Sequence, residues 1–192
     1  MRIIRLGRPA QVAALALLVV TAPVRLATAG QADAQSPALT KFNDAVERYV
    51  ALHRRLESSV APADISADAD QIIRAPTVLR ERLRRARGPV SEGAFFTPQM
   101  AALFKRLIRQ SYGSDAASLI KATHDEPDEL GRALVNEAWP GTALTTMPPS
   151  VLAAFPPLPA ELEYRFVHRD LVLWDVRADL IVDVLRDAIP AR

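Results

Sequence analysis

Apolar side chains recur at intervals of three and four residues through the first half of the chain. Between residues 37 and 57, charged residues such as Lys41, Glu47 and Arg55 separate them. The recurring positions are Phe42, Ala45, Val46, Tyr49, Leu52 and Leu56, with His53 at the boundary of the stripe. This spacing predicts an amphipathic helix of about five turns that begins near Ser36 or Thr40.

A second helical pattern covers residues 66–87. Its apolar stripe consists of Ile72, Pro76, Leu79, Leu83 and Ala86. Ser66 is a candidate N-cap, and we expect Pro76 to kink or restart the helix. Gly88, followed by Pro89, should end it.

Two more helices are expected before residue 125. Thr97 and Pro98 form a typical helix start, and Gly113 a typical end. The apolar face between them is Met100, Leu103, Phe104, Leu107 and Ile108. Ser114 then caps a short helix over residues 115–123.

The last third of the chain changes its pattern. Three short runs rich in β-branched and aromatic residues (164–167, 171–174 and 180–182) are separated by polar turns, which predicts an antiparallel β-meander over residues 161–187. A helical alternative remains for residues 171–188, because a second set of apolar residues also repeats at helical spacing. That set is Trp174, Ala178, Ile181, Leu185 and Ala188, with Asp175, Asp179, Asp183 and Asp187 opposite.

The segment between the helices and the meander has two parts. Residues 131–139 have a loose pattern that is compatible with a strand. Residues 139–160 contain six prolines around a short apolar turn from Val151 to Phe155 and read as an ordered crossover. We therefore expect a single α+β domain over residues 37–192, in which about four amphipathic helices (37–123) pack against a small C-terminal antiparallel sheet.

Residues 1–29 have the pattern of a secretory signal peptide. A basic start (Arg2, Arg5 and Arg8) precedes an apolar run from Val12 to Thr21, and Ala27-Thr28-Ala29 is a small-residue cleavage motif. The run is too short to span a membrane, so we expect cleavage after Ala29 or Ala34, and no transmembrane span afterwards. Residues 30–36 would form a flexible leader, and the mature protein would be periplasmic or extracellular.

Composition narrows the function classes. The chain has no cysteine, which excludes disulfide scaffolds, thiol chemistry and cysteine-ligated zinc. The 24 basic residues exceed the 22 acidic ones, but four arginines precede Ala29, and without them the balance is 20 to 22. The basic pI therefore gives no reason to expect nucleic-acid binding.

Catalytic candidates gather in the meander. Two carboxylates held close together can divide acid and base roles, and Asp170 and Asp175, with Arg169, are the candidates. Asp179 and Asp183 extend the same set. A turn or edge position is the simpler interpretation of each aspartate.

Other apparent motifs have simpler explanations. His168-Arg169-Asp170 imitates the kinase catalytic loop without its other elements, so a polar hairpin turn in which Arg169 pairs with an acid is favoured. The three histidines show no zinc-binding spacing. The acidic segment 124–129 lacks the glycine and ligand spacing of a calcium loop, so neither a metal nor another cofactor is expected.

A basic helix is the best binding candidate. Five arginines lie between residues 80 and 87, and Arg80, Arg84 and Arg87 would meet an anionic surface or an exported protein partner. A solvated, partly ion-paired face is the simpler interpretation.

Two stretches resemble a known group of proteins. Residues 93–108 (GAFFTPQMAALFKRLI) and 158–185 resemble segments of an uncharacterised family of exported bacterial proteins. The resemblance implies export and no particular activity. Where this chain has His168, similar proteins carry a glycine, which implies a tight turn.

The sequence thus favours a non-catalytic exported binding or interaction module. No nucleophile, base and orienting group stand at a recognisable spacing. The alternative is a hydrolase or lyase of unrecognised type that uses the C-terminal carboxylates.

Overall fold

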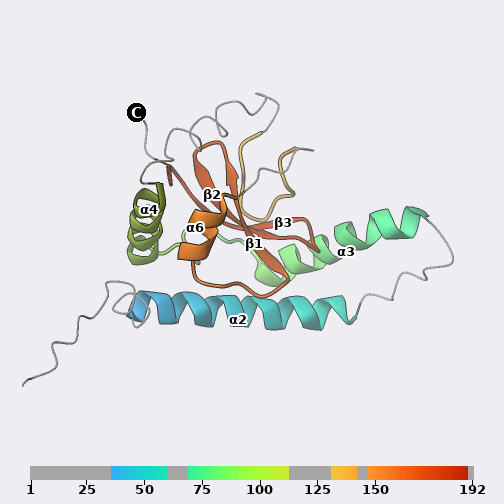
Figure 1. Cartoon of the computed structure of the whole chain (residues 1–192). Coiled ribbons are helices and arrows are strands. Elements are labelled where there is room, and N and C mark those ends of the chain that lie inside the picture. The colour runs from blue at the N-terminus through green and yellow to red at the C-terminus, as the bar shows by residue number, and fades with distance from the viewer. Residues whose placement is uncertain (1–35, 60–68, 113–130, 142–146, 190–192) are drawn as a thin grey trace, which may run out of the picture.

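Helices and a three-stranded sheet make up the chain in the order that the sequence predicts (Figure 1). This computed structural model describes residues 36–59, 69–112, 131–141 and 147–189, with the side chains of 69–74 and 112 excepted. The helices are α2 (Pro37–Glu57), α3 (Ala69–Arg87), α4 (Pro98–Tyr112) and α6 (Pro149–Ala154). The strands are β1 (Leu162–Val167), β2 (Asp170–Asp175) and β3 (Leu180–Leu185). The predicted α+β class is confirmed.

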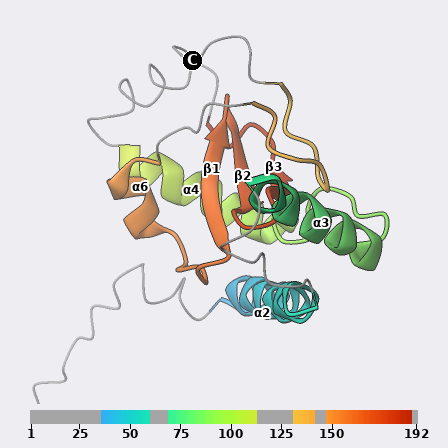
Figure 2. The same ribbon diagram turned by 90° about the vertical axis from the view of Figure 1, so that its right-hand side faces the viewer.

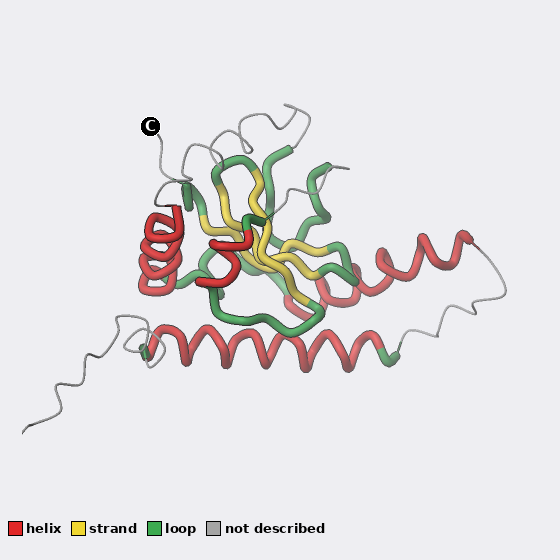
Figure 3. The backbone as a smooth tube through the Cα atoms, viewed as in Figure 1, coloured by secondary structure: helices red, strands yellow, loops and turns green. Residues whose placement is uncertain are grey.

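The sheet is an antiparallel meander with strand order β1-β2-β3. A two-residue turn joins β1 to β2, and its first residue, His168, has a φ of 52°. A tight hairpin turn requires such a positive φ angle, which glycine adopts most easily. The expected tight turn is therefore present at His168. The strands replace the helical alternative for residues 171–188, as Figure 3 shows.

A register shift in the second strand pair decides which way the aspartates point. Trp174 pairs with Ile181 and Leu173 with Asp183, so Val182 is an extra residue in β3. Without this bulge, strict alternation would place Asp183 on the face opposite Leu180. With it, Asp183 lies on the same side as Leu173.

Both faces of the sheet are covered, which explains why β2 and β3 are almost continuously buried. One face joins the main core with the helices, where Phe42, Phe104 and Phe166 are among the largest buried side chains. Residues 133–139 cover the other face, where the ring centroids of Trp139 and Trp174 lie 5.3 Å apart. In Figures 1 and 2, α2 runs beneath one end of the sheet, while α4 and α6 lie together beside it.

The helix ends follow local chemistry. Ser36 caps α2, because its side chain accepts a hydrogen bond from the Ala38 N–H at 3.3 Å. Gly88, with a φ of 65°, follows the last residue of α3, as expected of a C-terminal glycine. Pro76 lies inside α3, and the helix continues through it, so of the two expectations, a kink or a restart, the restart is wrong.

Two expectations for residues 131–160 need correction. Residues 131–139 do not form a strand, although Asn136 N–H and Glu137 C=O each hydrogen-bond to Ile181 at the edge of β3. Asn136 has a φ of 65°, which interrupts an extended backbone. Within the crossover, the apolar turn at Val151 forms the short helix α6.

Several expectations concern residues outside the described ranges. These are the signal peptide and leader up to residue 35, the cap at Ser66, the helix over 115–123 and the acidic segment 124–129. In the described part of the chain, no helix combines the length and the apolar character needed to cross a membrane.

Candidate functional site

A half-open pocket of about 710 Å³ lies between α6, the proline-rich segment that follows it, and β1. Its volume is in the range typical of small-molecule sites. The lining residues are Met147, Leu152, Ala153, Phe155, Pro156, Pro157, Leu158, Leu162, Glu163, Tyr164 and Arg165. The wall is therefore mainly apolar, with one acidic and one basic side chain.

Local sequence explains how the pocket wall is built. Pro156 and Pro157 follow Phe155, the C-cap of α6, and the helix cannot continue through them because proline has no backbone N–H and its ring clashes with the preceding turn. The Tyr164 O–H donates to Pro156 C=O at 3.2 Å, and the Tyr164 and Phe155 rings meet edge to face at 5.1 Å. These contacts attach the segment to β1. Burial raises the pKa of Tyr164 far above its ordinary value, so the phenol remains a neutral donor.

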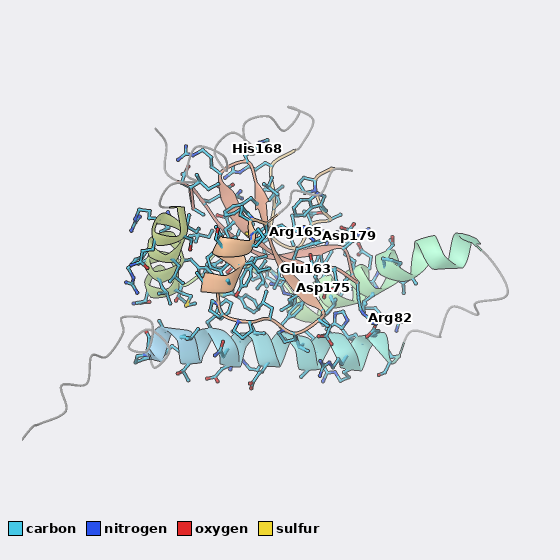
Figure 4. All side chains as sticks on the ribbon, in the orientation of Figure 1. Arg82, Glu163, Arg165, His168, Asp175 and Asp179 are labelled. Carbon is cyan, nitrogen blue, oxygen red and sulfur yellow. The ribbon has the colours of Figure 1, made fainter. Side chains whose placement is uncertain are left out.

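The charged residues of the pocket form an ion pair. Glu163 and Arg165 occupy alternate positions of β1 and so share a face of the strand, and Arg165 Nη2 donates to Glu163 Oε2 (Figure 4). The Glu163 side chain is 43% exposed, against 22% for Arg165. The guanidinium is thus the more enclosed partner. Among the lining residues, Leu152 is 50% exposed, and it is one of three large apolar side chains that are exposed in the described part of the chain.

Asp175 lies in a separate, fully buried polar cluster. Its Oδ2 accepts hydrogen bonds from Tyr49 O–H at 2.7 Å and from His53 Nδ1–H at 2.6 Å. Its Oδ1 accepts from the backbone N–H groups of Arg177 and Ala178. His53, placed at the helix boundary from the sequence, has no exposed surface.

The titratable groups of this cluster depend on one another. Burial alone would lower the pKa of His53, but hydrogen bonding to Asp175 and the charges of Asp175, Glu57 and Glu161 raise it above its ordinary value. The second ring nitrogen, Nε2, lies 3.5 Å from Glu57 Oε2. Burial and the Asp175 charge raise the pKa of Tyr49. An aspartate and a histidine in contact resemble part of a catalytic triad, but neither has exposed surface to meet a substrate.

Asp183 is equally buried, and its hydrogen-bond donors among the described residues are all backbone N–H groups. Its Oδ1 accepts from Gly93 and Val184 N–H, and its Oδ2 from Phe95 and Phe96 N–H, at distances of 2.7–2.9 Å. The carboxylate thereby fixes the loop that precedes α4. Gly93 has a φ of 89°, which a residue with a side chain rarely adopts.

The remaining catalytic candidates lie at or beside the turn between β1 and β2. Asp170 pairs with Arg186 at 2.6 Å and accepts from Asp187 N–H. Arg169 pairs with Asp187 at 3.2 Å, as expected for a hairpin turn. His168, at the turn, is far from Asp175 at the other end of β2 (Figure 4). The structure gives each candidate carboxylate its own set of partners.

The three arginines proposed for binding make contacts within the protein. Arg80 pairs with Asp179 at 2.8 Å, and Arg84 with Glu137 at 2.9 Å. Arg87 donates to Asn136 Oδ1 and Val182 C=O and lies over the Tyr49 ring. This arrangement favours the ion-paired interpretation of the helix.

Within the described ranges, no group of three or more histidine, aspartate or glutamate side chains is arranged to hold a metal ion. Comparisons of the chain with protein-family models, with curated proteins and with solved structures find no match. The function must therefore be argued from the geometry.

Sequence reasoning missed both the pocket and the buried histidine. A usable signal for the pocket was present in β1, where Glu163 and Arg165 alternate with Leu162, Tyr164 and Phe166. Charged residues in such a strand mark an edge with a polar side. His53 carried no comparable signal, because its partner is 122 residues away in the sequence.

Proposed function

We propose that this protein is an exported, non-catalytic binding module that takes a small molecule in the pocket between α6 and β1. The observation that carries the proposal is the pocket itself, because a cavity of about 710 Å³ with a mainly apolar wall and one charged pair has the size and chemistry of a ligand site. Export rests on the signal-peptide pattern of residues 1–29.

The positions of the carboxylates support binding over catalysis. Asp175 and Asp183 have no exposed surface, and their oxygens accept hydrogen bonds from the protein itself. The pocket contains one carboxylate, Glu163, which is paired with Arg165. General acid–base chemistry of the kind that two carboxylates perform would need a second one within reach of the substrate.

We place the proposed binding site in the pocket and not on α3, because the arginines of α3 already have partners within the protein. The three arginines donate hydrogen bonds within the protein: Arg80 to Asp179, Arg84 to Glu137 and Arg87 to Asn136. Binding an anionic surface would require these hydrogen bonds to break. The pocket volume is already open, and a ligand there would displace at most one ion pair of the lining, that of Glu163 and Arg165. Largely preformed sites of this kind reduce the cost of reorganisation on binding.

The test of binding is retention of a ligand. The protein would be purified under mild conditions and examined by native mass spectrometry, with Ala153→Trp to fill the pocket. Ala51→Trp is the matched control, because Ala51 is exposed on α2, outside the pocket lining. We expect a small-molecule adduct with the wild type and Ala51→Trp, and its loss with Ala153→Trp. An adduct that survives in Ala153→Trp, or none in the wild type, would contradict the proposal.

The test of export is the mass of the processed chain. Fractionation of expressing cells should place the protein outside the cytoplasm. The intact mass should correspond to a chain that begins at Gly30 or Gln35. Recovery of the unprocessed chain in the cytoplasm would overturn this half of the proposal and leave the pocket experiment valid.

A further inference from the structure

The wall of the pocket combines one guanidinium with an aliphatic surface. We propose that it binds a fatty acid, with the carboxylate on Arg165 and the acyl chain along Met147, Leu152, Leu158 and Leu162. This inference rests on the proposed binding function and names the ligand class of the same pocket.

The ion pair on β1 argues for a carboxylate head group. The planar guanidinium of arginine matches a carboxylate with two parallel hydrogen bonds. Arg165 already donates to one carboxylate, that of Glu163. The geometry therefore shows that a carboxylate fits at this place in the pocket wall.

Relative exposure indicates which partner would leave. Glu163 is about twice as exposed as Arg165, with 43% of its side chain accessible against 22%. Glu163 is the more solvent-exposed partner, so it is the one that can turn into solvent when another carboxylate takes its place. The ligand carboxylate would then replace Glu163 on Arg165. Glu163 thus acts as an internal competitor that occupies the guanidinium until a ligand arrives.

The rest of the wall argues for an aliphatic chain. The rings that line the pocket are Phe155 and Tyr164, and they contact each other and Phe104 at 4.7–5.5 Å. Their edge-to-face and tilted contacts engage them within the core, away from the stacking that an aromatic ligand would need. Met147, Leu152, Leu158 and Leu162 supply flexible aliphatic surface. The partly exposed Leu152 would be covered by such a chain.

Charge disfavours other amphiphiles. A cationic head group would meet Glu163 but also the Arg165 guanidinium beside it. A phosphate head carries more charge than a carboxylate, and the lining offers one basic residue to balance it. A single carboxylate is therefore the head group that matches one arginine.

Calorimetry on the delipidated protein tests the head group. Dodecanoate, below its micelle concentration, is the probe. Dodecanol and dodecyltrimethylammonium have the same chain with a neutral or cationic head, and 2-naphthoate has the carboxylate on an aromatic body. We expect dodecanoate to bind about tenfold or more tightly than the other three. Equal binding of dodecanol would overturn the carboxylate assignment, and preference for naphthoate would overturn the chain assignment.

Two substitutions test the residues. Arg165→Gln should weaken dodecanoate binding by about tenfold or more, whereas Glu163→Gln should strengthen it several-fold, because the internal competitor loses its charge. Arg109→Gln, on the exposed end of α4, is the matched control and should change nothing. Thermal unfolding of each variant identifies a loss of folding. If Arg165→Gln fails to fold, the gain in Glu163→Gln still decides, since unchanged or weaker binding there would overturn the proposal.

This test and that of the proposed function fail separately. A pocket-dependent adduct of another class, without dodecanoate binding, would overturn the fatty-acid assignment and leave the binding function standing. Absence of both would overturn both.

Discussion

Asp183 and Asp175 are both fully buried carboxylates on the helix-facing side of the sheet, yet they bind different kinds of donor. Asp183 accepts four backbone N–H groups, three of them from the loop before α4. Asp175 accepts two backbone N–H groups and two side-chain donors of α2, Tyr49 and His53. The first carboxylate fixes a loop, and the second fixes a helix.

The two sites differ in whether their hydrogen-bond donors can also act as acceptors. A backbone N–H can only donate, and its direction is set by the chain. A tyrosine hydroxyl can donate or accept, and a neutral histidine can place its proton on either nitrogen. The donors at the Asp183 site are therefore fixed in direction. The Asp175 site can rearrange and titrates through His53.

The largest expected effect is that of Asp183→Asn. The amide NH₂ that replaces one oxygen cannot accept, so it would face two of the backbone N–H groups that now donate to the carboxylate. Unsatisfied buried donors of this kind should lower the free energy of unfolding by about 3–5 kcal/mol in total. Urea denaturation of the purified protein measures the loss.

The matched control is Asp44→Asn, an exposed position on α2. Its effect should stay within about 0.5 kcal/mol. A cost for Asp183→Asn as small as that of the control would show that the loop before α4 does not depend on the carboxylate.

The same change at Asp175 should cost less. In Asp175→Asn, the new NH₂ can donate to His53 Nδ1 if the proton moves to Nε2, which lies 3.5 Å from Glu57. The Tyr49 hydroxyl can likewise accept. We therefore expect a loss of about 2 kcal/mol in the free energy of unfolding, measured in the same urea series. A cost equal to or above that of Asp183→Asn would contradict the distinction between fixed and adaptable donors.

How far the sequence predicts these sites depends on the range of the interactions. The meander follows from short runs such as Leu171–Trp174 and from turn residues such as His168, because strand preference and turn chemistry are local. The bulge at Val182 is not visible in the pattern, yet it turns Asp183 toward the helices. An alternating interpretation of β3 consequently places that aspartate on the wrong face.

Contacts between residues that are far apart in the sequence could not be predicted, and the sites depend on them. His53 and Asp175 are 122 residues apart, and Phe95 and Asp183 are 88 residues apart. The pocket likewise requires α6 to lie beside β1, which depends on the path of the prolines between them. A single sequence contains no pattern that pairs such distant positions. Residue types made the aspartates catalytic candidates, whereas the structure shows that two of them, Asp175 and Asp183, are buried and hydrogen-bonded within the protein.

The third prediction is a pH dependence confined to the Asp175 site. The pKa of His53 is raised in the folded protein above its ordinary value of 6.5. The folded state therefore binds this proton more tightly than the unfolded state does. The resulting stabilisation is complete below about pH 6.5 and is lost as the pH rises through the folded-state pKa. Urea denaturation at a series of pH values should show the free energy of unfolding fall over this window.

Two variants test whether His53 causes this pH dependence of the free energy of unfolding. His53→Gln should remove it, whereas Asp183→Asn should keep it on a lower baseline, because the donors of Asp183 do not titrate. His168→Gln is the control for an exposed histidine and should leave the slope intact. A slope that survives in His53→Gln would assign the effect to other groups.

The smallest expected effect is that of Tyr49→Phe. The ring would keep its place against Phe95 at 6.1 Å and beneath Arg87, so packing is preserved and one donor to Asp175 Oδ2 is lost. Asp175 retains His53 and two backbone donors, so the free energy of unfolding should fall by about 1 kcal/mol. With one donor fewer, Asp175 should depend more on protonated His53, and the pH slope should steepen in the same denaturation series. A flatter slope in Tyr49→Phe would mean that the hydroxyl, and not the imidazole, holds α2 on the sheet.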